Sequence, residues 1–245
     1  MSTRILLSGA TGVVGRTLVD LIAADQRCKL VGQASRHQAF DPSVTADVII
    51  DFSHPELLAS IIPYAEQRGL PLVVGTTGLD RSLEERLTKA ASRIPVCCAA
   101  NFSIGVNLLA RLAEQAAAAL DDDFDIEIME AHHRRKLDAP SGTALWLGQA
   151  VSRGRGLDFE SSAVHDRSQR RQARDRDEIG YQAVRGGDVA GEHTVFFLGD
   201  GERLELTHRS TDRRVFARGA LLAARRITSH DKGMVDFAAL VLGKN

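Results

Sequence analysis

A strand followed at once by three evenly spaced glycines and a helix constrains the fold of this chain more than any other segment. Residues 4–8 read Arg-Ile-Leu-Leu-Ser, a run typical of a buried strand, and glycines follow at positions 9, 12 and 15. Residues 16–24 have the composition and spacing of a helix. A strand, a tight turn and a helix in this order can hold a dinucleotide pyrophosphate at the N-terminus of the helix.

The glycine spacing is a weak signal when it is taken alone. Thr11 stands where the commonest fingerprint has its second glycine, and three glycines in a loop can serve turn geometry only. The context favours the dinucleotide-binding interpretation, because the strand precedes the loop, the helix follows it, and residues 30–32 predict a second strand.

The end of that second strand bears on which nicotinamide dinucleotide binds. A ribose 2′-hydroxyl is usually met by Asp or Glu about 20 residues beyond the glycine motif, whereas a 2′-phosphate calls for Arg. Residues 33–37 contain no acid and do contain Arg36, with Ser35 and His37 beside it. We therefore expect a preference for NADPH. NADH use stays open, because a neutral pocket can accept both cofactors, and an ordinary exposed arginine is the alternative interpretation.

Strands and helices alternate as far as residue 102. The apolar runs predict strands at 48–52, 72–74 and 96–100, separated by helices at 55–68 and 79–93. Continuous apolar strands separated by helices imply a parallel sheet that is covered on both faces. Ligands of such sheets lie at the carboxyl ends of the strands, which is where the loops 75–78 and 99–102 fall.

The pattern changes beyond residue 103. A helix is predicted over 104–120, with Leu108, Leu109 and Leu112 on one face, and a half-buried strand over 124–128. Residues 192–198 and 203–208 form a predicted antiparallel hairpin, with Leu204 and Leu206 facing inward. Since no helix separates these strands, they indicate a smaller second domain of the α+β class, with a mixed or antiparallel sheet.

These patterns predict an α/β protein of two domains. We expect a Rossmann-like domain with a parallel sheet to comprise residues 1–103 and 214–245, because the predicted helix 213–228 and the tail 233–242 can pack back on it. The second domain then comprises residues 104–213. Within it, residues 165–178 hold five arginines and four acids with almost nothing apolar, and they predict a mobile surface loop.

Composition excludes several classes of function. The formal net charge is −1, so no overall field favours nucleic acid as a partner. No apolar run approaches the roughly 20 residues that span a bilayer, and no cysteine or histidine spacing is typical of a metal site. The odd set of Cys28, Cys97 and Cys98 is typical of core residues in a reducing compartment. We expect a cytoplasmic protein that binds no membrane and holds no metal.

Chemistry is concentrated in residues 130–145, which read Glu-Ala-His-His-Arg-Arg-Lys-Leu-Asp-Ala-Pro-Ser-Gly-Thr-Ala-Leu. Histidine titrates near neutrality, and a lysine close to other cations becomes a better proton donor. His132 and Lys136 are therefore the candidate pair for proton transfer. The alternative is a solvated basic loop, but such a loop needs neither paired histidines nor a Ser-Gly-Thr turn.

That turn predicts the nature of the substrate. Ser141, Gly142 and Thr143 open a helix predicted over 143–151. Their backbone N–H groups would lie at a helix N-terminus, where unpaired donors and the positive end of the dipole attract a carboxylate or a phosphate. We expect an anionic substrate.

At this point the residues carry a family resemblance. The chain resembles the 4-hydroxy-tetrahydrodipicolinate reductase (dihydrodipicolinate reductase) family in order along nearly its whole length. The most specific motif is Glu-Ala-His-His…Lys…Asp-Ala-Pro-Ser-Gly-Thr-Ala, whereas the glycine loop is shared with many dehydrogenases. The remaining matching segments are residues 9–16, 51–56, 75–78, 101–107 and 185–193.

The resemblance implies NAD(P)H-dependent reduction of a cyclic dicarboxylate to tetrahydrodipicolinate with loss of water, in lysine and diaminopimelate biosynthesis. By position, His132 corresponds to the proton donor or acceptor, Lys136 to a second proton donor and His133 to a substrate contact. Gly142 and Thr143 correspond to the turn that binds a substrate carboxylate. The resemblance also implies a homotetramer built through the sheet of the second domain.

The cofactor residues follow from the same correspondence. The residues that match the pyrophosphate loop are Gly9, Ala10, Thr11, Gly12, Val13 and Val14. The residues that match the nicotinamide side are Gly75, Thr76, Thr77, Ala99, Ala100, Asn101 and Phe102. The chain departs from many relatives at Ser35 and Arg36, where they have an acid, and in a short, arginine-rich segment after Val151.

Two other functions are weighed against this one. A different dehydrogenase, acting on an amino acid or a semialdehyde, would share the glycine loop but not the cluster at 130–145. A protein that binds NADPH without catalysis, such as a redox sensor, is consistent with the first domain alone.

Overall fold

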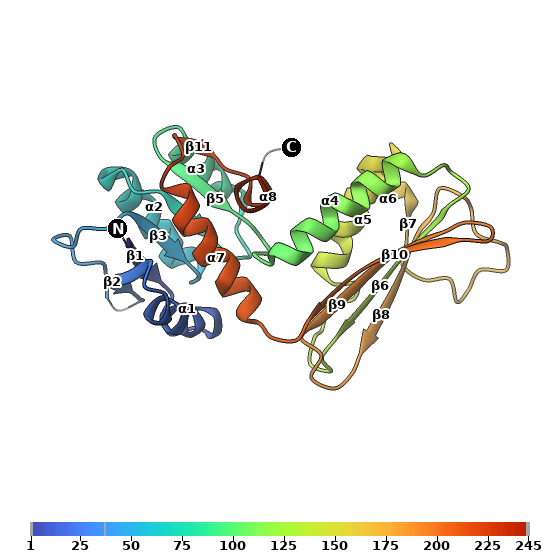
Figure 1. Ribbon diagram of the computed structural model, residues 1–245, viewed down its shortest axis with the longest axis horizontal. Coiled ribbons are helices and arrows are strands. Elements are labelled where there is room, and N and C mark those ends of the chain that lie inside the picture. Colours follow the sequence, from blue (N-terminus) through green and yellow to red (C-terminus); the bar gives the residue numbers. More distant parts are fainter. Residues whose placement is uncertain (1, 37, 244–245) are drawn as a thin grey trace. The chain divides into compact units, whose positions relative to one another are not determined.

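The computed structural model describes residues 2–36 and 38–243, and the chain divides into two compact units (Figure 1). The first unit consists of Met1–Ile104 and Arg213–Asn245, and the second of Gly105–Asp212. The second unit is therefore an insertion between two parts of the first. Every helix in the described ranges is too short or too polar to span a lipid bilayer.

The first unit is built on a six-stranded parallel sheet in the order β11-β5-β4-β3-β1-β2. The strands are β1 Thr3–Ser8, β2 Cys28–Ala34, β3 Val48–Asp51, β4 Leu72–Val74, β5 Pro95–Cys98 and β11 Gly233–Met234. The order runs outward from β1 in both directions, and in sheets of this kind ligands bind beyond the carboxyl ends of the central strands. The predicted Rossmann-like sheet is confirmed.

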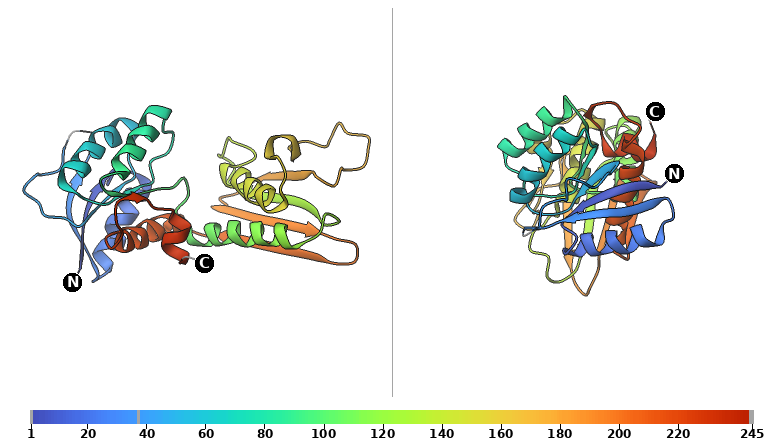
Figure 2. Two further views of the ribbon diagram at one scale, coloured as in Figure 1. Left: turned by 90° about the horizontal axis from the view of Figure 1, so that it is seen from above. Right: turned by 90° about the vertical axis from the view of Figure 1, so that its left-hand side faces the viewer.

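Helices cover both faces of this sheet (Figure 2). One face carries α1 Val13–Ala24, α7 Arg214–Ile227 and α8 Phe237–Leu242, and the other carries α2 Pro55–Arg68 and α3 Arg81–Ala91. Successive strand residues point to opposite faces, so Ile5 and Leu7 pack under α1 and α7 while Leu6 packs under α2 and α3. Full burial of each such side chain contributes about 1.5–3 kcal/mol to stability.

Close backbone packing shapes the turn between β1 and α1. Gly9 has a φ of +83°, and a Cβ atom there would lie 2.1 Å from the carbonyl oxygen of Phe52. A Cβ atom at Gly15 would lie 2.0 Å from the carbonyl oxygen of Gly9. At Gly12 the nearest atom would be 3.4 Å away, which is ordinary contact. The turn therefore needs the first and third glycines for its own packing, whereas the second position has room for a Cβ atom.

The second unit holds a five-stranded mixed sheet in the order β10-β9-β6-β8-β7. Its strands are β6 Asp125–His132, β7 Ala163–Val164, β8 Ile179–Arg185, β9 Gly191–Leu198 and β10 Arg203–Ser210. Its helices are α4 Ile104–Ala119, which begins at the unit boundary, α5 Gly142–Arg155 and α6 Phe159–Ser162. The core packs α4 and α5 on one sheet face, where it buries Leu109, Leu147 and Phe197. The predicted α+β unit with a mixed sheet is confirmed.

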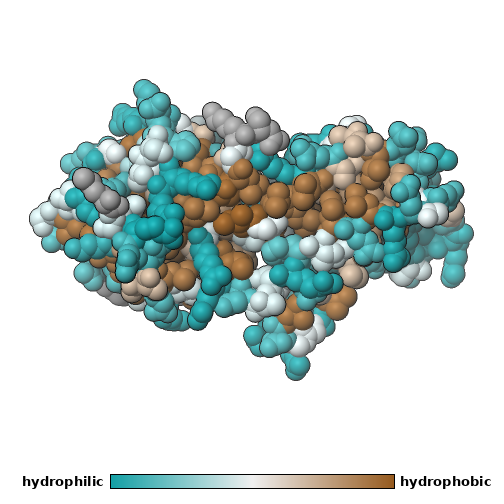
Figure 3. Space-filling view, in the orientation of Figure 1, coloured by the Kyte–Doolittle hydropathy of each residue, from teal (hydrophilic) through white to brown (hydrophobic). Residues whose placement is uncertain are grey.

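The predicted leucine face of α4 is divided between core and surface. Leu109 is buried, whereas Leu108 and Leu112 are 44 % and 43 % exposed. Apolar side chains accordingly gather on the outer side of α4 in the space-filling view (Figure 3). In the hairpin, Leu206 packs against the core, but Leu204 on the edge strand β10 stays 38 % exposed.

The arginine-rich segment 165–178 lies at the surface, as predicted, but ion pairs anchor it. Arg167 and Arg170 both bind the carboxylate of Glu178, and Arg174 lies 2.5 Å from Asp125. Arg174 also donates to the carbonyl oxygen of residue 126 on β6 at 3.2 Å. The pairs with Glu178 hold the segment to itself, and the Arg174 contacts tie it to the start of β6.

The packing of the glycine turn predicts unequal effects of two alanine substitutions. Gly15→Ala should lower the free energy of unfolding by about 2–3 kcal/mol, because its Cβ atom overlaps the Gly9 carbonyl and the turn must shift. Gly12→Ala is the matched control and should cost less, at most about 1 kcal/mol, because its Cβ atom meets only ordinary contacts and alanine is the poorer N-cap. Urea denaturation followed by circular dichroism measures both, and equal losses in the two variants would contradict this account of the turn.

Candidate active site

The carboxyl end of β6 places two titratable side chains together inside the second unit. Glu130 and His132 are two residues apart on a strand, so they point to the same face, toward the core. Glu130 is 1 % exposed, and its Oε2 lies 2.6 Å from Nδ1 of His132. The predicted strand ended at residue 128, whereas β6 extends to His132. His132 therefore belongs to the strand and not to the loop that follows it.

Glu130 is the most highly coordinated side chain of this site. The Arg185 guanidinium binds it with both branches, Nη1 to Oε2 at 2.7 Å and Nη2 to Oε1 at 2.6 Å. The backbone N–H of Ser141 donates to Oε1 at 3.0 Å. Charge-assisted, two-pronged bonds of this kind are strong and fix geometry.

The pKa values of this cluster follow from burial and charge. Burial alone would raise the pKa of Glu130, but the bonds from Arg185 and His132 outweigh it and hold the pKa below its usual value. Burial lowers the pKa of His132, and the nearby charges of Lys136 and Arg185 act in the same direction, against the opposing effect of Glu130. Glu130 is therefore an anion at neutral pH.

A further histidine, His193, completes the cluster from the neighbouring strand β9. Its Nε2 lies 3.2 Å from Oγ of Ser141, and its ring meets the ring of His132 edge-on at a centroid distance of 5.1 Å. His193 is only 4 % exposed, and burial lowers its pKa to about 4. It is therefore a neutral, structural imidazole that helps to hold Ser141.

The Ser-Gly-Thr turn lies at a helix start, as predicted. Ser141 is the N-cap of α5, and its Oγ accepts from the N–H of Ala144 at 3.2 Å. Gly142 is exposed and a Cβ atom there would meet nothing within 4 Å, while Thr143 is half-buried. The first turn of α5 thus presents its amide end beside the buried His132 and Glu130, an arrangement that suits an anion.

The remaining candidates occupy the loop between β6 and α5. Lys136 lies 2.9 Å from a carboxylate oxygen of Asp138, so its nearest charged partner is an anion rather than the neighbouring cations that the sequence argument invoked. His133 is half-buried, and Arg134 and Arg135 are exposed. The loop therefore places several cations near the helix start without burying them.

Sequence reasoning missed Arg185 and His193 as members of this site and gave Glu130 no role. The strand alternation of Glu130 and His132 was a usable signal, had the strand been extended to residue 132. No local pattern indicates Arg185, because its pairing depends on the register of β6 with β8, where His132 lies opposite Arg185. His193 likewise lies opposite Glu130 in the pairing of β6 with β9.

In the first unit, the predicted pyrophosphate loop lies at the surface. Thr11, Gly12 and Val13 are exposed, Val14 is half-buried and Ala10 is buried. Gly12 is the N-cap of α1, and having no side chain it cannot accept from the first-turn amides. These amides can therefore face a ligand.

The other cofactor candidates differ in accessibility. Arg36 is exposed in the turn after β2, and His37 lies outside the described residues. Around the ends of β4 and β5, Thr77 and Ala100 are exposed, whereas Gly75, Ala99 and Asn101 are half-buried.

Two nicotinamide-side candidates use their side chains inside the protein. Thr76 is 6 % exposed; its Oγ donates to Asp51 at 2.5 Å and accepts from the N–H of Ser53 at 2.8 Å. The ring of Phe102 is buried against Phe237 at a centroid distance of 4.7 Å. Only the backbone of these two residues is left for a ligand.

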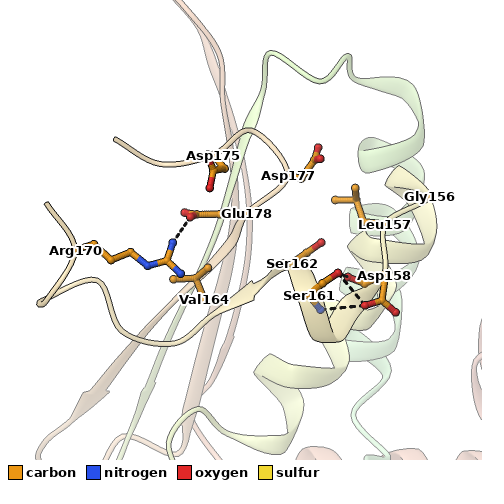
Figure 4. A pocket seen from close by; sticks show the side chains of 10 residues that line it. All are labelled: Gly156, Leu157, Asp158, Ser161, Ser162, Val164, Arg170, Asp175, Asp177 and Glu178. Atoms are coloured by element: carbon orange, nitrogen blue, oxygen red, sulfur yellow. Dashed lines mark hydrogen bonds and ion pairs between the residues drawn. The ribbon is translucent and has the colours of Figure 1, made fainter. Parts of the chain in front are cut away.

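A separate pocket of about 490 Å³ opens beside α6 in the second unit (Figure 4). Acidic side chains dominate its wall, including Asp158, Asp175 and Asp177, and Glu178 in the same wall is already paired with Arg170. Neither His132 nor His193 lines this pocket. Within the described part of the chain, no group of three His, Cys, Asp or Glu residues is placed to hold a metal ion.

Two family models match the chain and together cover nearly all of it. The model described as "Dihydrodipicolinate reductase, N-terminus" matches residues 3–102, and the one described as "Dihydrodipicolinate reductase, C-terminus" matches residues 105–241. The first match covers the strands β1 to β5 and the glycine turn of the first unit. The second covers the whole of the His132 cluster, which consists of Glu130, His132, Ser141, Arg185 and His193.

Named relatives agree with these matches. A 4-hydroxy-tetrahydrodipicolinate reductase of Thiobacillus denitrificans is 45% identical over 96% of this chain and 97% of its own. A protein of the same name from Alkalilimnicola ehrlichii is 41% identical over 96% of this chain and 97% of its own. Among solved structures, a dipicolinate-bound dihydrodipicolinate reductase from Paenisporosarcina sp. TG-14 has the same fold, with a TM-score of 0.78 at 24% identity over 96% and 98% of the two chains.

The buried His193 predicts a pH dependence of stability. Because its folded-state pKa is depressed from 6.5 to about 4, its contribution is fully present above pH 6.5 and is lost as the pH falls toward 4, when the unfolded chain binds the proton. The full shift corresponds to about 3 kcal/mol. His193→Gln keeps a polar partner for Ser141 but cannot titrate, so the stability gap between wild type and variant should shrink on acidification.

Urea denaturation at pH 7, 6, 5 and 4.5 measures this gap. A gap between wild type and His193→Gln that does not change with pH would contradict the assignment of His193 as a buried neutral ring.

Proposed function

The chain belongs to the dihydrodipicolinate reductase family, and we propose from that premise that it catalyses the NAD(P)H-dependent reduction of 4-hydroxy-tetrahydrodipicolinate. The product is tetrahydrodipicolinate and water is lost, a step of lysine and diaminopimelate biosynthesis. The family matches over residues 105–241, together with the His132 cluster inside them, carry this proposal. A cofactor-binding sensor accounts only for the first unit and leaves this cluster without a purpose.

The substrate is a dianion, and the second unit offers matching donors. We assign one substrate carboxylate to the backbone N–H groups of Gly142 and Thr143 at the start of α5, with Ser141 holding that turn. His133 is a further substrate contact in this assignment. The helix dipole and the exposed Arg134 and Arg135 add positive potential that attracts a dicarboxylate.

Proton transfer is assigned to His132 and Lys136. Reduction by hydride leaves negative charge on the substrate, and a neighbouring acid must neutralise it. His132 can give that proton from Nε2 only as the imidazolium, and it then returns to the neutral ring whose Nδ1–H stays bonded to Glu130. Lys136 is the second proton donor in this assignment, and its pairing with Asp138 keeps the ammonium on the same loop.

The residues of the first unit fit a dinucleotide. The glycine N-cap of α1 leaves the first-turn amides without a capping side chain, and a pyrophosphate is assigned to the loop from Gly9 to Val14. When bound, the dinucleotide supplies the hydride. Its nicotinamide is assigned to the carboxyl ends of β4 and β5. The residues there are Gly75, Thr76, Thr77, Ala99, Ala100, Asn101 and Phe102, with Thr76 and Phe102 contributing backbone only.

NADPH is the preferred cofactor in this proposal, with NADH also accepted. Arg36 supports the preference, because it is exposed in the turn that follows β2 and can meet a 2′-phosphate. No Asp or Glu occupies residues 33–37 to bind a free 2′-hydroxyl.

A cytoplasmic homotetramer completes the proposal. The sheet face of the second unit opposite α4 and α5 carries exposed apolar side chains, with Met129 and Val184 at 42 % and 51 %. An apolar sheet face of this kind is suited to association with other copies of the chain. The free cysteines Cys28, Cys97 and Cys98 are consistent with a reducing compartment.

The reaction is tested by the absorbance loss of NADPH, and separately of NADH, with freshly generated 4-hydroxy-tetrahydrodipicolinate. We expect rapid, substrate-dependent oxidation by wild type. His132→Gln should lower kcat by about 10²–10⁴-fold without weakening cofactor binding, because the general acid is lost.

His165→Gln is the matched control, because His165 lies in the same unit but outside the His132 cluster. Its exposed ring packs against Tyr181, with a distance of 5.0 Å between the ring centroids. Its kcat should equal that of wild type. Unchanged turnover in His132→Gln would remove this residue from the mechanism. Intact cofactor binding without turnover in wild type would refute the proposed reaction.

Arg36→Ala should weaken NADPH more than NADH. Loss of one arginine contact to a 2′-phosphate should raise the Kd for NADPH by about 10-fold or more, since a charge-assisted bond contributes about 1.5–3 kcal/mol. Fluorescence titration measures both constants. Arg27→Ala, at another exposed arginine of the first unit, should change neither. An equal loss of affinity for both cofactors would refute the phosphate contact.

A further inference from the structure

Three side chains on adjacent strands face the same side of the second sheet. Glu130 and His132 are two residues apart on β6, so their side chains share a face. His132 lies opposite Arg185 in the parallel pairing of β6 with β8. Their closeness is thus set by sheet register and does not depend on a flexible loop. Glu130 is 1 % exposed, and the side chains of His132 and Arg185 are 11 % and 18 % exposed.

The bonding pattern determines which nitrogen of His132 carries hydrogen toward Glu130. An ionised carboxylate can only accept, and Arg185 occupies both oxygens of Glu130 as a permanent donor. Nδ1 of His132 at 2.6 Å must therefore be the donor. Nε2 is left as the nitrogen that can take up and release a proton.

Gly191 puts no side chain against that second nitrogen. A Cβ atom built at Gly191 would lie 3.1 Å from Nε2 of His132. This is tighter than ordinary van der Waals contact, so a side chain there would crowd the ring nitrogen. The glycine at the start of β9 therefore leaves Nε2 approachable.

The same ion pair also fixes the loop that follows His132. Nη2 of Arg185 donates to the carbonyl oxygen of Asp138 at 2.5 Å, and Oε1 of Glu130 accepts from the N–H of Ser141 at 3.0 Å. These two anchors lie on either side of the turn into α5. Between His132 and these anchors lies Lys136, whose ammonium pairs with Asp138.

We propose that Glu130 and Arg185 are positioning residues for the reduction. Their ion pair holds His132 in the tautomer that presents Nε2 to the substrate, and it holds the Asp138–Ser141 turn that precedes the carboxylate-binding amides. The inference rests on the proposed function, because it takes His132 as the proton donor and residues 141–143 as a substrate contact. Neither residue needs to touch the substrate.

Glu130→Gln tests the pair while preserving side-chain shape. The glutamine amide has one oxygen and one NH₂ group, and the NH₂ group can only donate. If the NH₂ group replaces Oε2, it faces the donors of Arg185 and His132. If it replaces Oε1, it faces the donors of Arg185 and Ser141. In the first orientation Nδ1 can only accept, and the ring changes tautomer. We expect kcat to fall by about 100-fold with the KM for the dinucleotide unchanged.

The tautomer itself is read without turnover. In protein with ¹⁵N-labelled histidine rings at pH 8, the His132 signal is assigned by its loss in His132→Gln. Wild type should show Nδ1 protonated, and Glu130→Gln should show a mixture or the opposite tautomer. Wild-type kcat in Glu130→Gln, or an unchanged protonated Nδ1, would overturn the proposal.

A second variant guards against loss of folding. Arg185→Lys keeps the charge but not the two-branched contact, so kcat should fall less than in Glu130→Gln while Nδ1 stays protonated. Wild-type kcat in this variant would remove Arg185 from the pair. Glu114→Gln breaks an arginine pair with Arg153 on the helical surface of the same unit, and its kcat should match wild type.

The two readouts separate this inference from the function on which it rests. If wild type does not oxidise NADPH with the substrate, the proposed function fails. The ring-nitrogen spectra then decide alone whether Glu130 sets the tautomer of His132.

Discussion

A carboxylate that is 1 % exposed requires compensating charge, and the way Glu130 obtains it organises the second unit. Leaving a buried charge without a partner costs several kcal/mol, so every donor around it is under strong constraint. The donors come from separate elements: Arg185 from β8, His132 from β6 itself, and the Ser141 N–H from the start of α5. One anion thereby sets the relation of two strands and a helix. Apolar residues of equal volume could stabilise this core, but they could not orient an imidazole.

The first unit reaches local order by the opposite means, through side chains that are missing. Its turn closes because Gly9 lets the chain approach Phe52 and Gly15 lets α1 approach the turn. The peptide groups of the turn are then held by main-chain contact, and the open N-terminus of α1 stays free of a capping side chain. A rigid, uncapped helix start is what an anionic ligand needs, because the donors are arranged before it arrives.

The sequence predicted best where apolar periodicity decided the structure. The helix predicted over 55–68 has the same bounds as α2, and the strands at 4–8 and 72–74 agree within a residue with β1 and β4. The strand β8 was missed because its inner half is buried on both faces and its outer half is exposed, which hides the alternation. The cluster around Glu130 was half predicted: His132 and Ser141 were named from a local motif, whereas Arg185 lies 55 residues from Glu130 and meets it only through sheet register. Thr76 and Phe102 were named as candidates from their loops after β4 and β5, but tertiary packing turned both side chains inward.

The insertion of the second unit between β5 and α7 has a consequence for the order in which the chain acquires structure. The core of the first unit includes Ala220, Ala224 and Ile227 of α7, which follow the entire second unit in the chain. During synthesis from the N-terminus, residues 105–212 emerge completely before that helix does. The strands that precede them must wait with one face covered only by α1 until α7 and α8 arrive. The contacts between these strands and α7 join residues more than half the chain apart. Bringing such distant residues together costs loop-closure entropy, so these contacts form late. Compaction of the second unit shortens that loop, and completion of the first unit therefore depends on it.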